Sequence, residues 1–172
     1  MSDRRPLLAR WRVPLGFVTA MLALVLARPT WTTWMAGLAV AIAGELIRVW
    51  AAGHLEKSRE VTQSGPYRWM RHPLYVGSSV LALGIVIAAR SPVVAVAAAL
   101  YMAATITAAV RTEEAYLRRT FGDAYDRYSR SEAAPVRRSF SAARVMRNRE
   151  YRAVLGLTIG FALLALKILL PI

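Results

Sequence analysis

The stretch "PLYVGSSVLALGIVIAARSPVVAVAAALYMAATITAAV", residues 73–110, consists of two apolar runs separated only by Arg90 and Ser91. The runs cover residues 73–89 and 92–110, and roughly 17–25 apolar residues are enough for a helix to cross a bilayer. Pro73 suits the first position of a helix. A joint of two residues leaves room only for a tight hairpin. The stretch therefore predicts a pair of antiparallel membrane helices.

Three further apolar runs lie outside this hairpin, at Val13–Ala27, Trp31–Gly53 and Ala153–Ile172. We therefore predict an all-α integral membrane protein with about five transmembrane helices. Its 172 residues form a single membrane domain, in which residues 1–53 make an N-terminal helical hairpin. Residues 54–152 make the core that carries the hairpin 73–110, and residues 153–172 make the last transmembrane helix. We expect no cleaved signal peptide, because "ARPTW" is a poor cleavage site and another apolar run follows at once.

Charge follows the same plan, since the chain is 56% hydrophobic and yet has a formal net charge of +13. Basic residues gather in the N-terminus and in the two long polar joints, 54–72 and 111–152. The opposite side has only Arg28 and Arg90, with Lys167 near the end of the chain. The positive-inside rule then places the N-terminus and both joints in the cytoplasm and the C-terminus outside. The basic charge follows membrane topology, so we expect no nucleic-acid partner.

Residue types exclude several classes of chemistry. The chain has no cysteine, so disulfides and thiol catalysis are excluded. Its two histidines, His54 and His72, lie far from any carboxylate pattern with ligand spacing, so we expect no metal site. There is no glycine-rich nucleotide loop of the GxGxxG or P-loop type.

The joint 111–152 is predicted to be structured. The last helix of the hairpin should continue through "RTEEAYLRRTF", and Gly122 should end it. Asp123 should cap a new helix, with Asp126 in its first turn. The segment 139–151 places Phe140, Ala143 and Met146 on one face, which predicts a helix at the membrane surface.

The first candidate site is "GPYRWMRHPLYVG", residues 65–77, at the mouth of the hairpin. Pro73 pushes His72 out of helical geometry, so Arg71 and His72 should stand at a helix N-terminus, which attracts anions. Tyr67, Trp69 and Tyr75 could stack on a planar ring or a cation. The alternative is an interfacial belt of aromatic and basic residues that binds no ligand.

Other polar or small residues allow a functional and a structural interpretation. Glu113 and Glu114 could accept hydrogen bonds from a ligand hydroxyl or ammonium, or they could simply pair with nearby arginines. Glu45 and Arg48 lie inside an apolar run, where charges are functional candidates, but a local ion pair is the simpler account. The motif "GLTIG", residues 156–160, predicts close helix packing.

Two motifs together resemble the isoprenylcysteine carboxyl methyltransferase family and its phospholipid N-methyltransferase relatives. The family pattern is RHPxYxG, followed about 35 residues later by EExxLxxxFGxxYxxY, and the likeness covers residues 54–130. The matching positions are Arg71, His72, Pro73, Tyr75 and Gly77, then Glu113, Glu114, Leu117, Phe121, Gly122, Tyr125 and Tyr128.

The resemblance implies a membrane enzyme that uses S-adenosylmethionine. Carried over, it implies a cytoplasmic-side cofactor pocket and a lipophilic acceptor or lipid that arrives from the bilayer. The cofactor residues would be His54, Tyr67, Arg71, His72, Pro73, Tyr75, Gly77, Glu113 and Glu114. Methyl transfer to such an acceptor mainly requires alignment and desolvation of the two reactants.

The chain departs from the family after the second motif. Relatives that methylate carboxylates continue into an "RVP"-like segment, whose arginine is thought to hold the acceptor. Here the chain reads "YSRSEAAPVRR", so Arg130 or Arg137 could take that role, and Glu132 stands where an apolar residue is expected. We predict Arg71, Glu114 and Arg130 as the catalytic residues. A carboxylate or an amine acceptor, an NADPH-dependent membrane reductase and a non-enzymatic scaffold stay open.

Overall fold

The computed structural model describes residues 7–134 and 136–170, with side chains from residue 14 onward. All regular structure in this part of the chain is helical, as predicted. The basic residues Arg4 and Arg5 of the N-terminus lie outside the described residues. The elements in chain order are α1 (Leu7–Leu26), α2 (Trp31–His54), the short 3-10 helix η1 (Gly65–Arg68), α3 (Pro73–Ala89), α4 (Pro92–Phe121), α5 (Asp123–Ser129), α6 (Ala142–Arg147) and α7 (Tyr151–Leu169).

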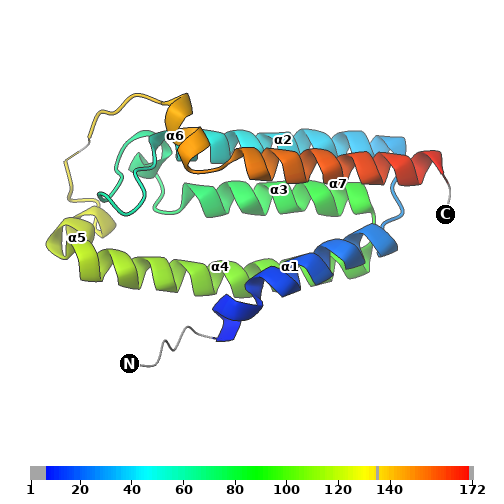
Figure 1. The fold of residues 1–172 in the computed structure, drawn as a ribbon, viewed down its shortest axis with the longest axis horizontal. Helices are drawn as coiled ribbons and strands as arrows, with labels where there is room; N and C mark the ends of the chain where they lie inside the picture. Colours follow the sequence, from blue (N-terminus) through cyan, green and yellow to red (C-terminus); the bar gives the residue numbers. More distant parts are fainter. Residues whose placement is uncertain (1–6, 135, 171–172) are drawn as a thin grey trace.

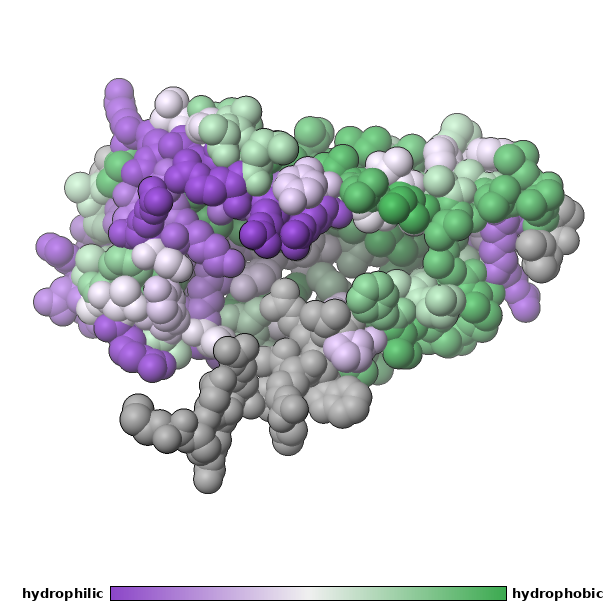
Figure 2. Space-filling view, in the orientation of Figure 1, coloured by the Kyte–Doolittle hydropathy of each residue, from purple (hydrophilic) through white to green (hydrophobic). Residues whose placement is uncertain are grey.

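The long helices form two layers, as Figure 1 shows. Helices α2, α3 and α7 run side by side in one layer, and α4 with α1 forms the other. The layers meet near the α3–α4 turn and separate toward η1, α5 and α6. Hydrophilic residues gather around those three short helices, which we call the polar end, while the rest of this face is largely hydrophobic (Figure 2).

The closest helix contact is the seam between α2 and α3, which is built from small residues. A Cβ on Gly84 would lie 2.5 Å from the Ala41 nitrogen and 2.5 Å from the Gly37 oxygen. A Cβ on Gly77 would lie 2.7 Å from the Gly44 oxygen. Such distances leave no room for a side chain, so the two backbones touch directly. Lipid is as apolar as the helices, so the hydrophobic effect does not drive membrane helices together. They associate instead through close packing at small residues.

At the other end of the molecule, the α1–α2 joint is hydrogen-bonded to the end of α3, beside the α3–α4 turn. Arg90 ends α3 in the left-handed conformation, with φ 48°, and the Ser91 side chain caps α4 by accepting from the Val94 N–H. The Arg28 backbone N–H donates to the Ala89 carbonyl over 2.8 Å. This bond ties the α1–α2 joint to the α3–α4 joint, so the tight hairpin predicted from residues 73–110 is confirmed.

Helix α7 is attached to α2 at two levels. The Trp34 indole donates to the Phe161 carbonyl over 2.9 Å. Nearer the polar end, Arg48 pairs with Glu45 at 3.2 Å and with Glu150 at 2.7 Å. The local pair predicted for Glu45 and Arg48 is therefore confirmed, and Glu150 extends it to the start of α7. Because an unpaired buried charge is costly, this cluster fixes the register of α7 against α2.

The helix boundaries confirm most of the sequence expectations. The runs at 31–53 and 73–89 are helices, and α4 continues past residue 110 to Phe121. Among the residues whose side chains the structure describes, three helices, α2, α4 and α7, are long and apolar enough to cross a membrane, and the apolar helices 14–26 and 73–89 are shorter. The chain is an integral membrane protein, and the count of five spans stays a prediction.

Three local expectations were wrong. Asp123 is the first helical residue of α5, because Gly122, with φ 48°, already occupies the cap position. The predicted surface helix over 139–151 shrinks to α6, and Phe140 precedes it and packs against Gly53 instead. The motif 156–160 makes no close helix contact, since a Cβ on either glycine would meet nothing within 4 Å.

The seam predicts that a large side chain at Gly37 destabilises the protein. Gly37→Leu should lower the free energy of unfolding by about 2 kcal/mol or more, because the buried position offers no space. Urea unfolding in detergent measures the change. Ala36→Leu is the matched control, since the neighbouring Ala36 is exposed. Equal stability of both variants and the wild type would contradict the seam.

Candidate functional site

A cavity of about 770 Å³ opens between the two layers at the polar end. Its walls come from α1, the segment 55–62, η1, the start of α3, residues 100–117 of α4, and α5. Ligand cavities commonly fall in the range of roughly 300–1,000 Å³. The wall combines aromatic, apolar and charged side chains, and the tyrosines are Tyr67, Tyr75, Tyr101, Tyr116, Tyr125 and Tyr128.

One wall forms because the backbone changes direction before α3. His72 is the N-cap residue of α3 with φ −131° and ψ 59°, and Pro73 takes the first helical position, both as predicted. Upstream, η1 buries Tyr67, whose carbonyl accepts a hydrogen bond of 2.8 Å from the Tyr128 hydroxyl of α5. Burial raises the pKa of Tyr67 far above its usual value and that of Tyr128 to about 12. Both phenols therefore stay neutral at physiological pH.

The imidazole of His72 links α3 to the two carboxylates of α4. Its Nε2 lies 3.1 Å from Glu114 Oε1, and its Nδ1 lies 3.7 Å from Glu113 Oε2. Arg71 approaches Glu114 from the solvent side at 3.4 Å. The interaction with Glu113 raises the pKa of His72, burial opposes it, and Glu114 adds to the rise. When His72 is protonated, it offsets one of two neighbouring negative charges.

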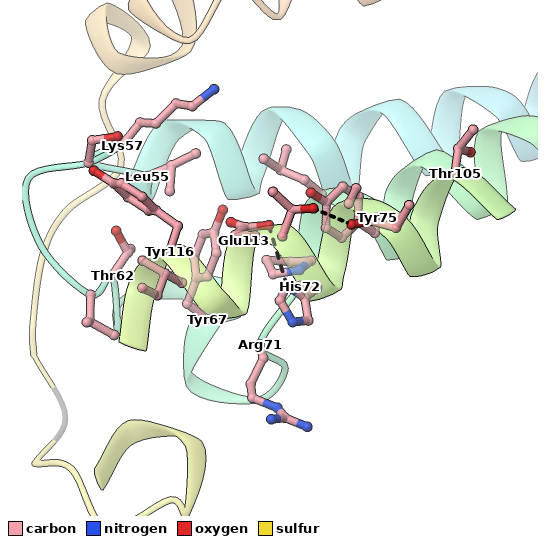
Figure 3. Close-up of a pocket in the computed structure, with 18 of the residues that line it drawn as sticks. Leu55, Lys57, Thr62, Tyr67, Arg71, His72, Tyr75, Thr105, Glu113 and Tyr116 are labelled. Atoms are coloured by element: carbon pink, nitrogen blue, oxygen red, sulfur yellow. Dashed lines mark hydrogen bonds and ion pairs between the residues drawn. The ribbon is translucent and has the colours of Figure 1, made fainter. Parts of the chain in front are cut away.

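Glu113 is the carboxylate that faces the cavity. In Figure 3 it points toward Tyr75 and His72 in the space that Tyr67 and Tyr116 also border, whereas Arg71 points away from them. The Tyr75 hydroxyl hydrogen-bonds to Glu113. This leaves a carboxylate in a fixed position beside aromatic rings, an arrangement that suits a cation or a hydroxyl donor.

The opposite wall, residues 55–62, is held in place by the arginine-rich joint. Arg138 forms two hydrogen bonds to Glu60, at 2.6 and 2.8 Å. Glu56 pairs with Arg147 at 3.4 Å and with Arg144 at 3.6 Å. A bidentate pair fixes orientation as well as distance. Part of the basic series that indicated membrane topology therefore also shapes this cavity.

A second cavity of about 470 Å³ adjoins the first and lies among α1, α3, α4 and α7. Thr19 and Tyr101 line both cavities. The second cavity is almost entirely apolar, with Arg48 and Ser78 on its wall. The Arg48 guanidinium donates to the Ser78 hydroxyl over 2.5 Å. The larger cavity is thus the more polar of the two, and the cavities meet at two side chains.

The structure brings most of the predicted site residues together. Tyr67, Arg71, His72, Pro73, Tyr75 and Glu113 line the larger cavity. Glu114 stands behind His72 and orients it.

Three predicted residues lie elsewhere among the described residues. His54 packs beside Gly65, with its Nδ1 3.2 Å from the Ser64 hydroxyl. Gly77 belongs to the α2–α3 seam, where it admits the Arg48 side chain. Arg130 is exposed and is not among the described residues that line either cavity. Trp69 stacks near Trp50 with its ring exposed, which fits the interfacial-belt alternative.

Several lining residues lie outside any pattern that sequence analysis could have selected. Lys57 and Thr62 come from a polar joint without a motif, and Tyr116 lies one helical turn beyond Glu113 inside the second motif. A helical spacing of three from Glu113 was the available signal for Tyr116. Thr19 and Tyr101 sit in apolar runs, where a hydroxyl was the only hint.

Comparisons with known proteins agree with the two motifs. The family model described as phospholipid methyltransferase matches residues 34–124. The chain is 31% identical over 134 residues to protein-S-isoprenylcysteine O-methyltransferase A of Arabidopsis thaliana, covering 71% of this chain and 68% of that protein. No solved structure matches the chain.

Two bacterial relatives have names of a different kind. The chain is 33% identical over 136 residues to a nickel-cobalt-cadmium resistance protein of Alcaligenes xylosoxydans, covering 72% of this chain and 61% of that protein. It is 34% identical over 134 residues to a cobalt-zinc-cadmium resistance protein of Cupriavidus metallidurans, covering 72% and 60%. The chain thus spans less than two thirds of the length of these relatives.

The His72 network predicts a pH dependence of stability. Because the pKa of His72 is raised in the folded protein, its contribution is fully present below its unfolded pKa, about 6.5, and is lost as pH rises through the higher folded value. The thermal unfolding midpoint, followed from about pH 6 to pH 9, should fall more steeply in the wild type than in His72→Gln. Parallel profiles for the two proteins would contradict the network.

Proposed function

The chain belongs to the phospholipid methyltransferase family, and on this premise we propose that it is a membrane methyltransferase that uses S-adenosylmethionine to methylate a lipophilic acceptor. The observation that carries the proposal is the contact at Thr19 and Tyr101 between a cavity with charged and tyrosine side chains and a more apolar one. A water-soluble donor and a lipid-soluble acceptor need such a junction to meet.

The larger cavity fits the chemistry of this cofactor. S-adenosylmethionine combines an adenine ring, ribose hydroxyls, an ammonium, a carboxylate and a sulfonium. The tyrosines around Tyr67 and Tyr116 offer faces for the ring, and Glu113 offers a carboxylate for a hydroxyl or a cation. Lys57 lines the same cavity and offers positive charge for the carboxylate, whereas Arg71 points away from Glu113 and pairs with Glu114.

The part played by the chain is binding, orientation and exclusion of water. When bound, the cofactor would supply a methyl group activated by positively charged sulfur, and that sulfur would leave as a neutral thioether when the acceptor takes the methyl group. His72 and Tyr75 hold the carboxylate of Glu113 beside the cavity, and Glu114, itself paired with Arg71, orients His72, so the site is ordered before the reaction. Neutral Tyr67 and Tyr128 keep this wall free of further negative charge. Alignment in a dry cavity then accounts for most of the expected rate gain.

The methyl acceptor could belong to either of two chemical classes. The name of the Arabidopsis relative favours an isoprenylcysteine-like carboxylate, and the description of the family model favours an amine of a phospholipid. A carboxylate is ionised at neutral pH, whereas an amine must first lose a proton. Arg130, predicted to hold a carboxylate, is exposed and lies away from both cavities, so the geometry gives that role no support.

The site lies at the cytoplasmic side in this proposal. The positive-inside rule assigns the arginine-rich polar end to the cytoplasm. The shorter apolar helices 14–26 and 73–89, together with α2, α4 and α7, make up five spans, which leaves the C-terminus outside.

The metal-resistance names of two relatives do not enter this proposal. Over residues 7–134 and 136–170, no group of three or more histidine, cysteine, aspartate or glutamate side chains is placed to hold a metal ion. The proposal rests on the family and on the relatives that are named as methyltransferases.

Calorimetry in detergent with S-adenosylhomocysteine, the demethylated product, tests whether the protein binds the proposed methyl donor. The wild type should bind it, and Glu113→Gln should lose about tenfold in affinity or more, since a hydrogen bond to a charged group is worth about 1.5–3 kcal/mol. Glu132→Gln is the matched control, because Glu132 is exposed and stands outside both cavities. Arg130→Ala should also bind normally.

Labelled S-adenosylmethionine, incubated with the protein in its membranes, tests whether the methyl group is transferred to a lipophilic acceptor. Label should appear in the lipid fraction after separation of lipids, proteins and small molecules. Absence of any heat of binding in the wild type would overturn the proposal, and binding of NADPH would favour a reductase. Unchanged cofactor affinity in Glu113→Gln would remove Glu113 from the site.

A further inference from the structure

We propose that the smaller cavity receives an apolar chain of the methyl acceptor, and that Gly156 and Gly160 determine which chains fit. The inference deepens the proposed function and rests on it. The cavity adjoins the donor cavity at Thr19 and Tyr101, so a group held there has its free end at the place of transfer.

The polarity of the cavity matches an amphiphile. Arg48 and Ser78 lie on its wall near the polar end, within about one helical turn of Tyr75 in the larger cavity. The rest of the wall is apolar apart from the two hydroxyls at the junction. An acceptor lying here would have its polar head beside the donor cavity and its apolar chain along the helices.

The cavity also ends within the protein. Its wall on α3 runs from Ser78 to Ala89, eleven residues or roughly 16 Å along a helix. At the far end Ala89, Val94 and Leu164 are all buried in the hydrophobic core. A chain that enters from the junction therefore meets a closed floor, which limits its length.

The two glycines of α7 keep this space open. Both line the cavity on its open side, where Gly156 is exposed and Gly160 partly buried, and a Cβ added to either would meet nothing within 4 Å. This is the opposite of the α2–α3 seam, where added Cβ atoms collide with backbone. Small residues on membrane helices normally serve close contact between helices, so two glycines that face open space on a cavity wall need another explanation.

The attachments of α7 explain why the void does not collapse. The Phe161 carbonyl is hydrogen-bonded to Trp34 of α2, and Lys167 donates to the Leu24 and Val25 carbonyls of α1, at 2.9 and 2.7 Å. These contacts fix α7 relative to both layers near the apolar end. Toward the polar end the layers separate, and the space-filling view is hollowed between them (Figure 2).

The variants Gly156→Leu and Gly160→Leu test the inference. Each side chain has room and replaces a glycine in a helix interior, so the thermal unfolding midpoint should stay equal or rise. Affinity for S-adenosylhomocysteine should not change. Methylated lipids from membranes, separated by mass spectrometry, should lose their longest-chain species at least about tenfold, while short-chain species persist. Ile159→Leu is the control and should keep the wild-type distribution, because Ile159 is not among the described residues that line the cavity.

An equal change in all methylated species, or none, in both glycine variants would overturn the inference. Methylation of no lipid by the wild type would instead count against the proposed function. A binding assay that does not depend on methylation separates the two outcomes. The chain has no native cysteine, so a single introduced cysteine can be labelled specifically. In Ala98→Cys, on the cavity wall of α4, dodecanol in nanodiscs should slow labelling by N-ethylmaleimide. The combination with Gly160→Leu should abolish this protection, and equal labelling with and without dodecanol in Ala98→Cys would contradict chain binding.

Discussion

Direct backbone contact between α2 and α3 is the constraint on which the rest of the structure depends. Four glycines remove the side chains from this seam, so the two helices behave as one rigid unit. Since α3 is fixed to α2, the tight turn at Arg90 and Ser91 lets α4 diverge from both toward the polar end. The divergence creates the two cavities, and α1 and α7 close their sides.

The division of the space follows from the solubility of the two reactants in the proposed reaction. Charged and aromatic groups gather where the helices leave the apolar layer, and small or aliphatic groups line the remainder. The charged groups are satisfied by one another. His72 lies between two carboxylates of α4, and the wall formed by residues 55–62 is held by Arg138, Arg144 and Arg147. These pairs hold the donor cavity in shape before any ligand is bound.

The sequence predicted helices better than it predicted which way their residues face. Apolar runs and proline positions located α2, α3 and the start of α4 almost to the residue. The motif residues Tyr67, His72 and Glu113 share a cavity because a local turn and one helix carry them there.

The residues whose roles the sequence analysis missed or misassigned are those that depend on a distant partner. Gly77 faces α2, the 156–160 motif faces a void, and Arg138 pairs with Glu60, which precedes it by 78 positions. None of these relations has a local signature in the chain.

The central claim, that donor and acceptor meet at Thr19 and Tyr101, is tested most directly by an experimental structure with S-adenosylhomocysteine bound. The account predicts its adenosine among the tyrosines of the larger cavity and its sulfur toward Tyr101. A cofactor bound outside this cavity, or with its sulfur turned away from the junction, would contradict the account.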